Sequence, residues 1–429
     1  MILMAQPESR MTTSLLFKNA HLLDPLQPEL QENHHVLVED GVIKEVSDRP
    51  IKAGSARVVD AAGRTLMPGL IDLHVHVLAT QLNLSTQGVL ADALVMMRSV
   101  PIMEAMLRRG FTTVRDAGGA GWGLKCAIEE GTIRGPRLFI SGHAISQTGG
   151  HGDPRPRSDH LRPMSYCGCC FRAGDISRVA DGIDEVRRAV RQELQMGADQ
   201  IKIMASGGVA SPTDPIAAFG YSEDEIRVIV EEAAGRQTYV MAHSYTADAI
   251  ERAVRNGVRT IEHGNLIDER VAKFMASKGA FVVPTLVTYE ALANEGADYG
   301  LPADSVAKIE TVRAAGLRSL EIYKRAGVKM GYGSDLLGPS QRLQSDEFRI
   351  RREVLSAQEV IQCATTTAAE VLNQVGRLGR IQVGALADLL LVDGNPYRDL
   401  SCLLGQGEHL KLIVKGGVVQ YDELEKAGA

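Results

Sequence analysis

Apolar runs typical of buried strands alternate with amphipathic stretches typical of helices through the middle of the chain. There are eight such runs, at residues 66–77, 112–116, 137–141, 200–205, 239–243, 259–263, 281–285 and 329–334. Amphipathic segments between them include 184–196, 222–235 and 246–256. Ser222, with Glu225 three residues later, predicts a capping box, and Thr246 is the expected cap of the next helix. This alternation predicts an α/β fold in which residues 65–379 form a (β/α)8 TIM barrel.

Both chain ends follow a different pattern, with short apolar runs separated by turn residues. Asp40-Gly41 separates two such runs near the start, and Gly416-Gly417 separates two near the end, as in β-hairpins. We therefore expect residues 13–64 and 380–421 to build one small β-sandwich domain together. Residues 1–12 are expected to be a disordered prefix, and residues 422–429 a tail.

Composition narrows the class of protein. The 429 residues are 45% hydrophobic, enough for a large core, whereas the net charge of −6 and 4% aromatic residues argue against a nucleic-acid partner. No apolar stretch approaches the roughly 20 residues of a transmembrane helix, and the start does not resemble a signal peptide. Six cysteines are too few for a disulfide scaffold, so we expect a cytoplasmic protein in which Cys167, Cys169 and Cys170 form a reduced loop segment.

Polar residues able to bind a metal occur at the ends of several predicted strands, where the active sites of such barrels lie. His74 and His76 end the first run, and as residues i and i+2 of a strand they face the same side. Lys202 lies among apolar residues of the fourth run, so it either points outward or is paired or modified. His243 and His263 end the fifth and sixth runs.

Asp335 directly follows the eighth run. Any one of these six residues has an ordinary structural explanation, such as a helix cap for Asp335 or a hydrogen-bonded strand end for a histidine. Six of them together at strand ends predict a metal site. Because the set offers nitrogen and oxygen but no sulfur, zinc or a similar divalent ion suits it.

Longer motifs surround these residues. Pro-Gly-Leu-Ile-Asp-Leu-His-Val-His (68–76), Thr-Val-Arg-Asp-Ala-Gly (113–118), Ile-Glu-His-Gly (261–264) and Gly-Arg-Ile-Gln-Val-Gly-Ala-Leu-Ala-Asp-Leu (379–389) resemble the amidohydrolase superfamily over nearly the whole chain. Gln-Thr-Gly-Gly-His-Gly-Asp (147–153), Lys-Ile-Met-Ala-Ser-Gly-Gly-Val (202–209) and Leu-Leu-Gly-Gln-Gly-Glu-His (403–409) are similar to the imidazolonepropionase-related branch with bacterial prolidases. Ochratoxin-cleaving amidohydrolases are neighbours in that branch.

The resemblance implies a binuclear zinc site and a homo-oligomer. His74, His76 and Asp335 would hold one ion, and His243 and His263 the other. Lys202 would carry a carbamate derived from carbon dioxide that bridges the two ions. A metal-bridging hydroxide would then attack the amide of an Xaa-Pro dipeptide or an N-acyl amino acid, with Asp335 as general base.

Loop residues are the candidates for substrate contact. His151 follows the third run and is expected to be catalytic, by binding the developing oxyanion, or to contact the substrate; His143 is a second candidate for substrate contact. Tyr245, two residues after His243, and Arg155 or Arg157 are candidates for binding the substrate carboxylate. Residues 206–221, rich in Gly, Pro and Ala, are expected to form a lid or pocket wall.

Several alternatives remain open at this point. An amidase for an aryl-acyl amino acid such as ochratoxin and a lactonase would use the same chemistry, whereas a cyclic amidase such as imidazolonepropionase usually has a single metal. A deaminase of this superfamily usually uses one metal and no bridging lysine, so Lys202 counts against it. A non-catalytic scaffold would be expected to have lost one or more of the six ligands, and all six are present.

Overall fold

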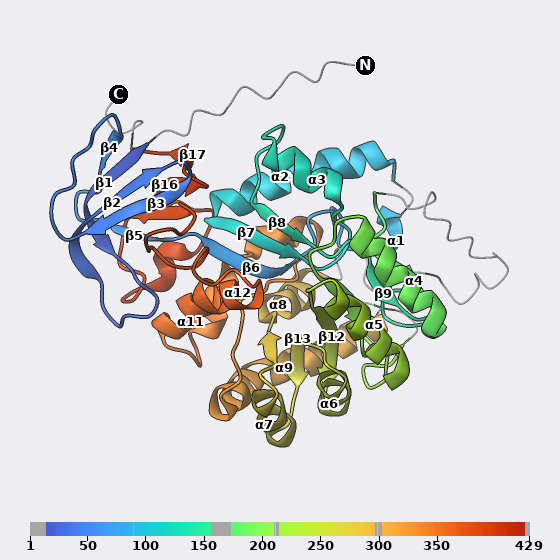
Figure 1. Ribbon diagram of the computed structural model, residues 1–429. Coiled ribbons are helices and arrows are strands. Elements are labelled where there is room, and N and C mark those ends of the chain that lie inside the picture. Colours follow the sequence, from blue (N-terminus) through green and yellow to red (C-terminus); the bar gives the residue numbers. More distant parts are fainter. Residues whose placement is uncertain are drawn as a thin grey trace, which may run out of the picture.

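Parallel sheets flanked by helices occupy the middle of the molecule, and a separate sheet formed by both chain ends lies at one side (Figure 1). The computed structural model describes residues 14–88, 90–153, 155, 173–209, 211, 214–296, 298 and 303–424. The predicted prefix 1–12, Arg157, the cysteines 167, 169 and 170, and the last five residues of the predicted tail lie outside this range.

The described strands are β1 (Leu15–Leu22), β2 (Gln31–Glu39), β3 (Val42–Ser47), β4 (Arg57–Asp60), β5 (Thr65–Pro68), β6 (Leu70–Val75), β7 (Phe111–Asp116), β8 (Arg137–Ile140), β9 (Ala144–Ser146), β10 (Ser177–Val179), β11 (Ile201–Met204), β12 (Val240–Thr246), β13 (Thr260–Leu266), β14 (Phe281–Val283), β15 (Leu389–Val392), β16 (Leu410–Lys415) and β17 (Val418–Asp422).

The described α-helices are α1 (Leu84–Gln87), α2 (Asp92–Arg108), α3 (Trp122–Glu129), α4 (Gly182–Gln195), α5 (Glu223–Gly235), α6 (Ala247–Arg255), α7 (Glu269–Ser277), α8 (Leu286–Glu295), α9 (Ala303–Ala326), α10 (Asp346–Arg351), α11 (Ala357–Cys363) and α12 (Thr366–Val371). Two short 3-10 helices are also described, Gly338–Leu343 and Leu400–Leu403. No helix in the described ranges is both long enough and apolar enough to cross a bilayer.

Seven of the eight predicted runs form strands of two parallel sheets, in the orders β6-β7-β8 and β10-β9-β11-β12-β13-β14. The eighth run, 329–334, forms only a single bridge, between Met330 and Val282. Backbone hydrogen bonds nevertheless hold it between β6 and β14, from Leu73 N to Tyr332 O (2.8 Å) and from Gly331 N to Val282 O (2.8 Å). The α/β class with parallel strands is therefore confirmed.

The first predicted run is wrong as a single strand. It divides at Gly69 into β5, which belongs to the sheet of the chain ends, and β6, which belongs to a parallel sheet. Gly69 N donates to Asp388 O (2.8 Å), and a Cβ at this position would lie 2.1 Å from Thr112 Oγ1. The chain therefore passes from one sheet to the other at a glycine, the residue type that lets the backbone lie this close to the Thr112 side chain.

The chain ends share one eight-stranded sheet in the order β17-β16-β15-β5-β1-β2-β3, with β4 paired to β1. β15 is buried on both faces because Leu389 and Leu391 face the core of this sheet, whereas Leu390 and Val392 pack into the central core. Asp388, directly before β15, pairs with Arg137 at the start of β8 (2.5 Å). The C-terminal strands therefore join the two parts of the molecule.

The structure tests the two helix caps predicted from the sequence. The predicted capping box of Ser222 and Glu225 is present at the start of α5. Thr246 takes the predicted N-cap position of α6, but its side chain makes no capping hydrogen bond.

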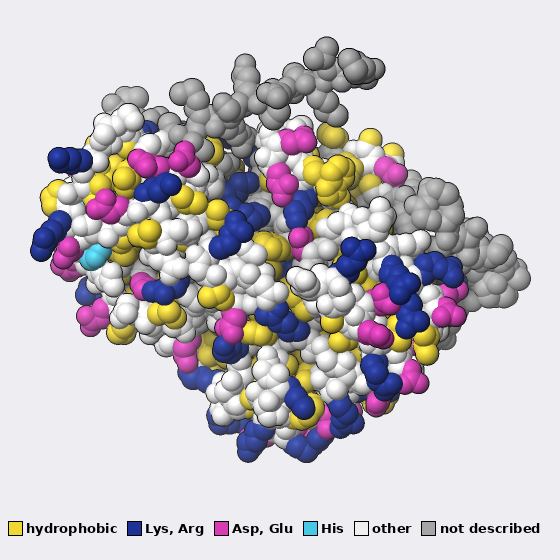
Figure 2. Space-filling model, in the orientation of Figure 1, with side chains coloured by type: hydrophobic (Ala, Val, Ile, Leu, Met, Phe, Trp, Pro, Cys, Tyr) yellow, Lys and Arg dark blue, Asp and Glu magenta, His cyan; other side chains and the backbone are white. Residues whose placement is uncertain are grey.

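Charges on the outer helices are interspersed, as the face in Figure 2 shows. Glu232 of α5 binds both Arg187 and Arg191 of α4, at 3.0 and 2.8 Å. Such partly exposed pairs contribute about 1 kcal/mol or less each, so the helices are held mainly by their buried faces.

Replacing Gly69 by Ala is expected to destabilise the fold by about 1–3 kcal/mol, because the new methyl would overlap the buried Thr112 side chain. Urea denaturation would measure the loss. The matched control is Gly123→Ala in α3, where a Cβ meets nothing within 4 Å. That variant should be neutral or slightly stabilising, and an equal loss in both would contradict the packing explanation.

Candidate metal centre

Side chains from the carboxyl ends of five strand segments meet above the parallel sheets. Register brings β11, β12 and β13 level there, since Met204 of β11 pairs with His243 of β12, and Ser244 of β12 pairs with His263 of β13. Asp335 N donates to His74 O (2.8 Å), which holds the end of the eighth run beside β6. The predicted residues His74, His76, Lys202, His243 and His263 are each at most 5% exposed.

Asp335 is the centre of the cluster. One carboxylate oxygen, Oδ1, lies 3.4 Å from His74 Nε2 and 3.3 Å from His76 Nε2, and Oδ2 lies 3.9 Å from His263 Nδ1. Ligand atoms of His74, His263 and Asp335 lie within 4.8 Å of one another. His243 adjoins them, with its ring centre 4.6 Å from that of His263. A donor set this close fits a divalent cation.

The protonation of these groups also fits a metal. Burial lowers the pKa of both His243 and His263 well below the usual value, so both imidazoles are neutral and keep a lone pair. Burial would raise the pKa of Asp335, but the charges and hydrogen bonds of His74 and His76 outweigh it and hold that pKa well below the usual range. Burial would lower the pKa of His76, but the Asp335 carboxylate outweighs it and raises that pKa. The cluster therefore offers the neutral nitrogens of His243 and His263 and the ionised carboxylate of Asp335.

The histidine rings are held from behind at Nδ1. His74 Nδ1 lies 2.8 Å from Glu262 Oε2, and His76 Nδ1 lies 3.0 Å from Gly118 O. His263 Nδ1 lies 2.8 Å from Thr285 Oγ1. Contacts of this kind fix the ring orientation and leave Nε2 of His74 and His76 for the cluster, as in known carboxylate–histidine–metal arrangements.

Glu262 is a buried carboxylate that the sequence analysis did not assign. Its second oxygen accepts from Arg115 (2.8 Å), and both side chains are fully buried. Burial would raise the pKa of Glu262, but Arg115 and His74 outweigh it and lower that pKa to about 2. Arg115 also donates to Leu73 O (2.6 Å), so one guanidinium orients both the strand before His74 and the carboxylate behind it.

The backbone is left-handed at two of the cluster residues, His263 (φ 73°) and Asp335 (φ 50°). In a regular strand, consecutive side chains such as Glu262 and His263 would face opposite sides of the sheet. The turn at His263 instead lets both approach the cluster. Each such conformation costs on the order of 1–3 kcal/mol in a residue other than glycine, and this kind of strain concentrates at functional sites.

His151 and Tyr245 lie beside the cluster. The His151 ring stacks on the His243 ring with centres 4.2 Å apart, and the Tyr245 ring stacks on that of His263 at 5.3 Å. His151 Nδ1 lies 2.9 Å from Ser211 Oγ, in the segment 206–221 predicted as a lid or pocket wall. Gly207 of the same segment directs its carbonyl to His243 Nε2 (3.2 Å).

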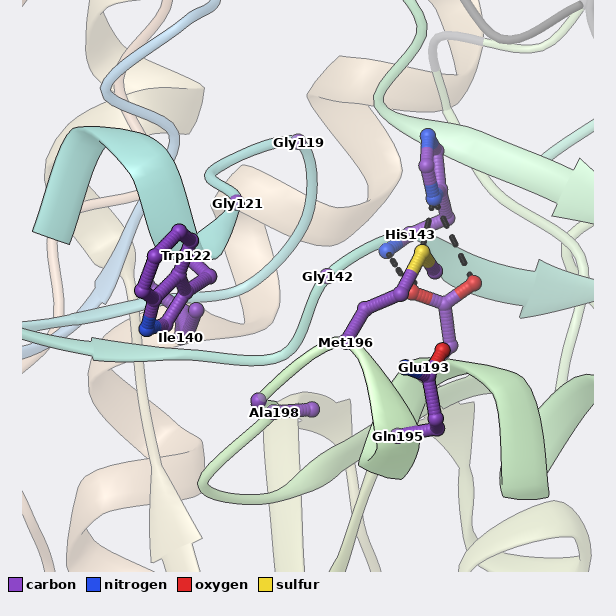
Figure 3. Close-up of a pocket in the computed structure, with 11 residues that line it drawn as sticks. Gly119, Gly121, Trp122, Ile140, Gly142, His143, Glu193, Gln195, Met196 and Ala198 are labelled. Atoms are coloured by element: carbon purple, nitrogen blue, oxygen red, sulfur yellow. Dashed lines mark hydrogen bonds and ion pairs between the residues drawn. The ribbon is translucent and has the colours of Figure 1, made fainter. Parts of the chain in front are cut away.

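His143 and Arg155 have other partners. His143 Nδ1 lies 3.3 Å from Glu193 Oε1, and both residues line a surface pocket of about 500 Å³ with Trp122 and Met196 (Figure 3). Arg155 binds both carboxylate oxygens of Asp153, at 2.7 and 2.6 Å. This geometry groups His151 and Tyr245, but neither His143 nor Arg155, with the candidate metal ligands.

Comparison with known proteins places the chain among hydrolases. The model of the Amidohydrolase family matches residues 65–419. The crystal structure of an amidohydrolase superposes with a TM-score of 0.95 at 65% identity, covering 96% of this chain and 100% of that one. A prolidase in complex with N-methylphosphonate-L-proline gives 0.93 at 56% identity, with the same coverage.

A third relative is the ochratoxinase of Aspergillus niger, which is 34% identical over 416 residues, covering 93% of this chain and 85% of its own length. The resemblance inferred from the motifs, including the prolidase and ochratoxin-cleaving relatives, is therefore confirmed, and so is the assignment as a hydrolytic enzyme.

Replacing Glu262 by Gln is expected to lower the affinity for a divalent metal by about 10- to 100-fold, because the ring of His74 loses its anionic partner. Titration of the metal-free protein with zinc against a chelating indicator would measure this change, and circular dichroism would check the fold.

The control for this variant is Glu347→Gln. Glu347 is a fully buried carboxylate paired with Arg351 (2.7 Å), as Glu262 is with Arg115. The change should leave metal affinity unaltered. Equal losses of metal in both variants would mean that Glu262 acts only through stability.

Proposed function

Because the chain belongs to the amidohydrolase family, we propose that it hydrolyses the amide bond of Xaa-Pro dipeptides or N-acyl amino acids at a site with two zinc ions. The observation that carries the proposal is the cluster around Asp335, with His74, His76 and His263 in reach and His243 beside it. The 56% identity to a prolidase supports the choice of bond.

The proposed ligand sets are His74, His76 and Asp335 for one ion, and His243 and His263 for the other. When bound, such ions lower the pKa of water and polarise a carbonyl group. Lys202 is proposed to carry the carbamate between them. Burial lowers the pKa of Lys202 to about 8 against the charges of Glu262 and Asp335, and the neutral amine is the form that reacts with carbon dioxide.

Asp335 is the proposed general base. Its ionised carboxylate takes the proton of the attacking water and passes it to the leaving nitrogen. The side chain remains 21% exposed, whereas His74 beneath it is 1% exposed, so Asp335 is open to a substrate. His151, neutral because burial lowers its pKa, is proposed to donate to the oxyanion.

Tyr245 is the proposed partner of the substrate carboxylate. Tyr289 donates its hydroxyl proton to Tyr245 Oη (2.9 Å), which leaves the Tyr245 proton for another acceptor. Burial raises the pKa of Tyr245, so that proton stays in place at neutral pH. Arg155 is a weaker candidate because Asp153 already binds its guanidinium.

An aryl-acyl amino acid is the alternative substrate. Tyr245 and Tyr289 belong to a buried apolar cluster with Leu82, Val209 and Leu292, which would suit an aromatic acyl group. The 34% identity to an ochratoxinase also favours an aryl-acyl amino acid as substrate.

The proposal extends to the architecture. Hydrogen bonds from the eighth run to β6 and β14, and from Asp199 N to Ile140 O (2.7 Å), support a closed (β/α)8 barrel over 65–379. We also propose that residues 13–64 and 380–421 form a β-sandwich, that the protein is a homo-oligomer and that it is cytoplasmic.

Changing Lys202 to Ala is expected to reduce hydrolysis by more than about 100-fold and the metal content from about two ions per chain to one or fewer, because a direct ligand contributes more than the contacts behind it. Elemental analysis of the purified protein would count the ions. The control is Lys125→Ala, which removes a lysine paired with Asp199 away from the cluster. Full activity in the Lys202 variant would refute the bridged site.

The substrate is tested by a library of Xaa-Pro and other dipeptides, N-acyl amino acids, ochratoxin-like amides and lactones. We expect cleavage of amides with a free carboxylate next to the scissile nitrogen. Cleavage of lactones alone would overturn the proposed function.

A further inference from the structure

Asp214 is a buried carboxylate close to His151. It lies in the segment 206–221 and is 5% exposed. Oδ2 accepts from Gly208 N (2.9 Å), whereas Oδ1 has no hydrogen-bond partner among the residues that the structure describes. Within the described ranges no lysine or arginine forms an ion pair with it. Burying an ionised carboxylate this way is costly unless a cation or donor binds there.

The carboxylate lies on the same side of the cluster as His151. Gly208, which donates to Asp214, packs so closely on the imidazole that a Cβ would lie 2.0 Å from His151 Nδ1. Ser211 holds that nitrogen at 2.9 Å, and Gly207 O reaches His243. The segment carrying Asp214 therefore forms a wall of the proposed active site.

Lys308 of α9 holds this wall in position. Its ammonium donates to the carbonyl oxygens of Gly208 (3.4 Å), Ser211 (3.0 Å) and Asp214 (2.8 Å). These bonds go to main-chain oxygens, so they fix the loop and do not satisfy Asp214 Oδ1. The loop is thus anchored with one anionic oxygen available.

We propose that Asp214 binds the α-ammonium group of a dipeptide substrate. This inference rests on the proposed function. In a dipeptide, the ammonium is attached to the carbon next to the scissile carbonyl, so it must lie close to the residues that act on that carbonyl, His151 among them. An N-acyl amino acid has no such cation, so its binding would leave the Asp214 carboxylate without a cationic partner, as in the free protein.

The consequence is a preference between the two proposed substrate classes. A charge pair formed in a buried site strengthens binding of the cationic substrate, whereas an uncharged acyl chain gains nothing from Asp214. The protein is therefore a dipeptidase in preference to an N-acyl amino acid hydrolase.

L-alanyl-L-proline and N-propionyl-L-proline test this, since they differ only by the ammonium group. For the zinc-loaded protein, kcat/KM should be higher for L-alanyl-L-proline. Asp214→Asn should lower it by roughly 30-fold or more for that dipeptide. The variant should change N-propionyl-L-proline by less than about threefold, because the amide oxygen of Asn can still accept from Gly208 N.

Asp181→Asn is the matched control, since it removes one negative charge from a carboxylate that binds Thr148 (2.6 Å) outside the proposed site. It should leave the ratio of the two kcat/KM values unchanged. Parallel losses for both substrates in the Asp214 variant, or no loss for either, would overturn the ammonium site. A wild-type protein that prefers N-propionyl-L-proline would also overturn it while sustaining the proposed function, whereas cleavage of neither substrate would refute the proposed function itself.

Discussion

The buried chain of contacts from Arg115 through Glu262 to His74 is the constraint on which the site depends. A guanidinium and a carboxylate without exposure to water are costly, and they persist only when every polar atom finds a partner. Arg115 finds its partners on β6 and β13, and Glu262 finds its partners in Arg115 and the His74 ring. The same bonds that offset desolvation therefore connect neighbouring strands and set the orientation of the first histidine.

Backbone strain at His263 and Asp335 follows from a similar compromise. The strands supply one inward position every second residue, yet the cluster needs more side chains than that spacing gives. The left-handed turn at His263 brings Glu262 and His263 to one site. Hydrogen bonds from Ser334 and Asp335 to His74 O hold the other turn in place. The strained backbone at these two residues costs free energy that a site built on loops would avoid. In return, the strands hold the side chains in fixed positions.

The sequence predicts most of the parallel strands and the six candidate ligands because hydrophobic periodicity and strand-end histidines are local features. It does not predict the role of Glu262, because strand alternation assigns this residue to the face opposite His263. Arg115 would ordinarily be expected at the surface, and its burial depends on a carboxylate 147 residues away. The need for a glycine at position 69 is likewise set by Thr112, and the His143 ring is bound by Glu193. Each departure arises from a tertiary contact.

The two-faced burial of β15 has a consequence for the order in which the molecule can be made. β1 to β5 leave the ribosome before β15, which is the antiparallel neighbour of β5 and lies more than 300 residues later in the chain. That edge of β5 stays open until β15 has been synthesised, and until then Leu66 can pack only on the side chains of β1 and β2. During translation the sheet formed by β1 to β5 therefore has an exposed strand edge, the kind of surface that chaperones bind. Completion of this sheet by β15 becomes a late event in folding.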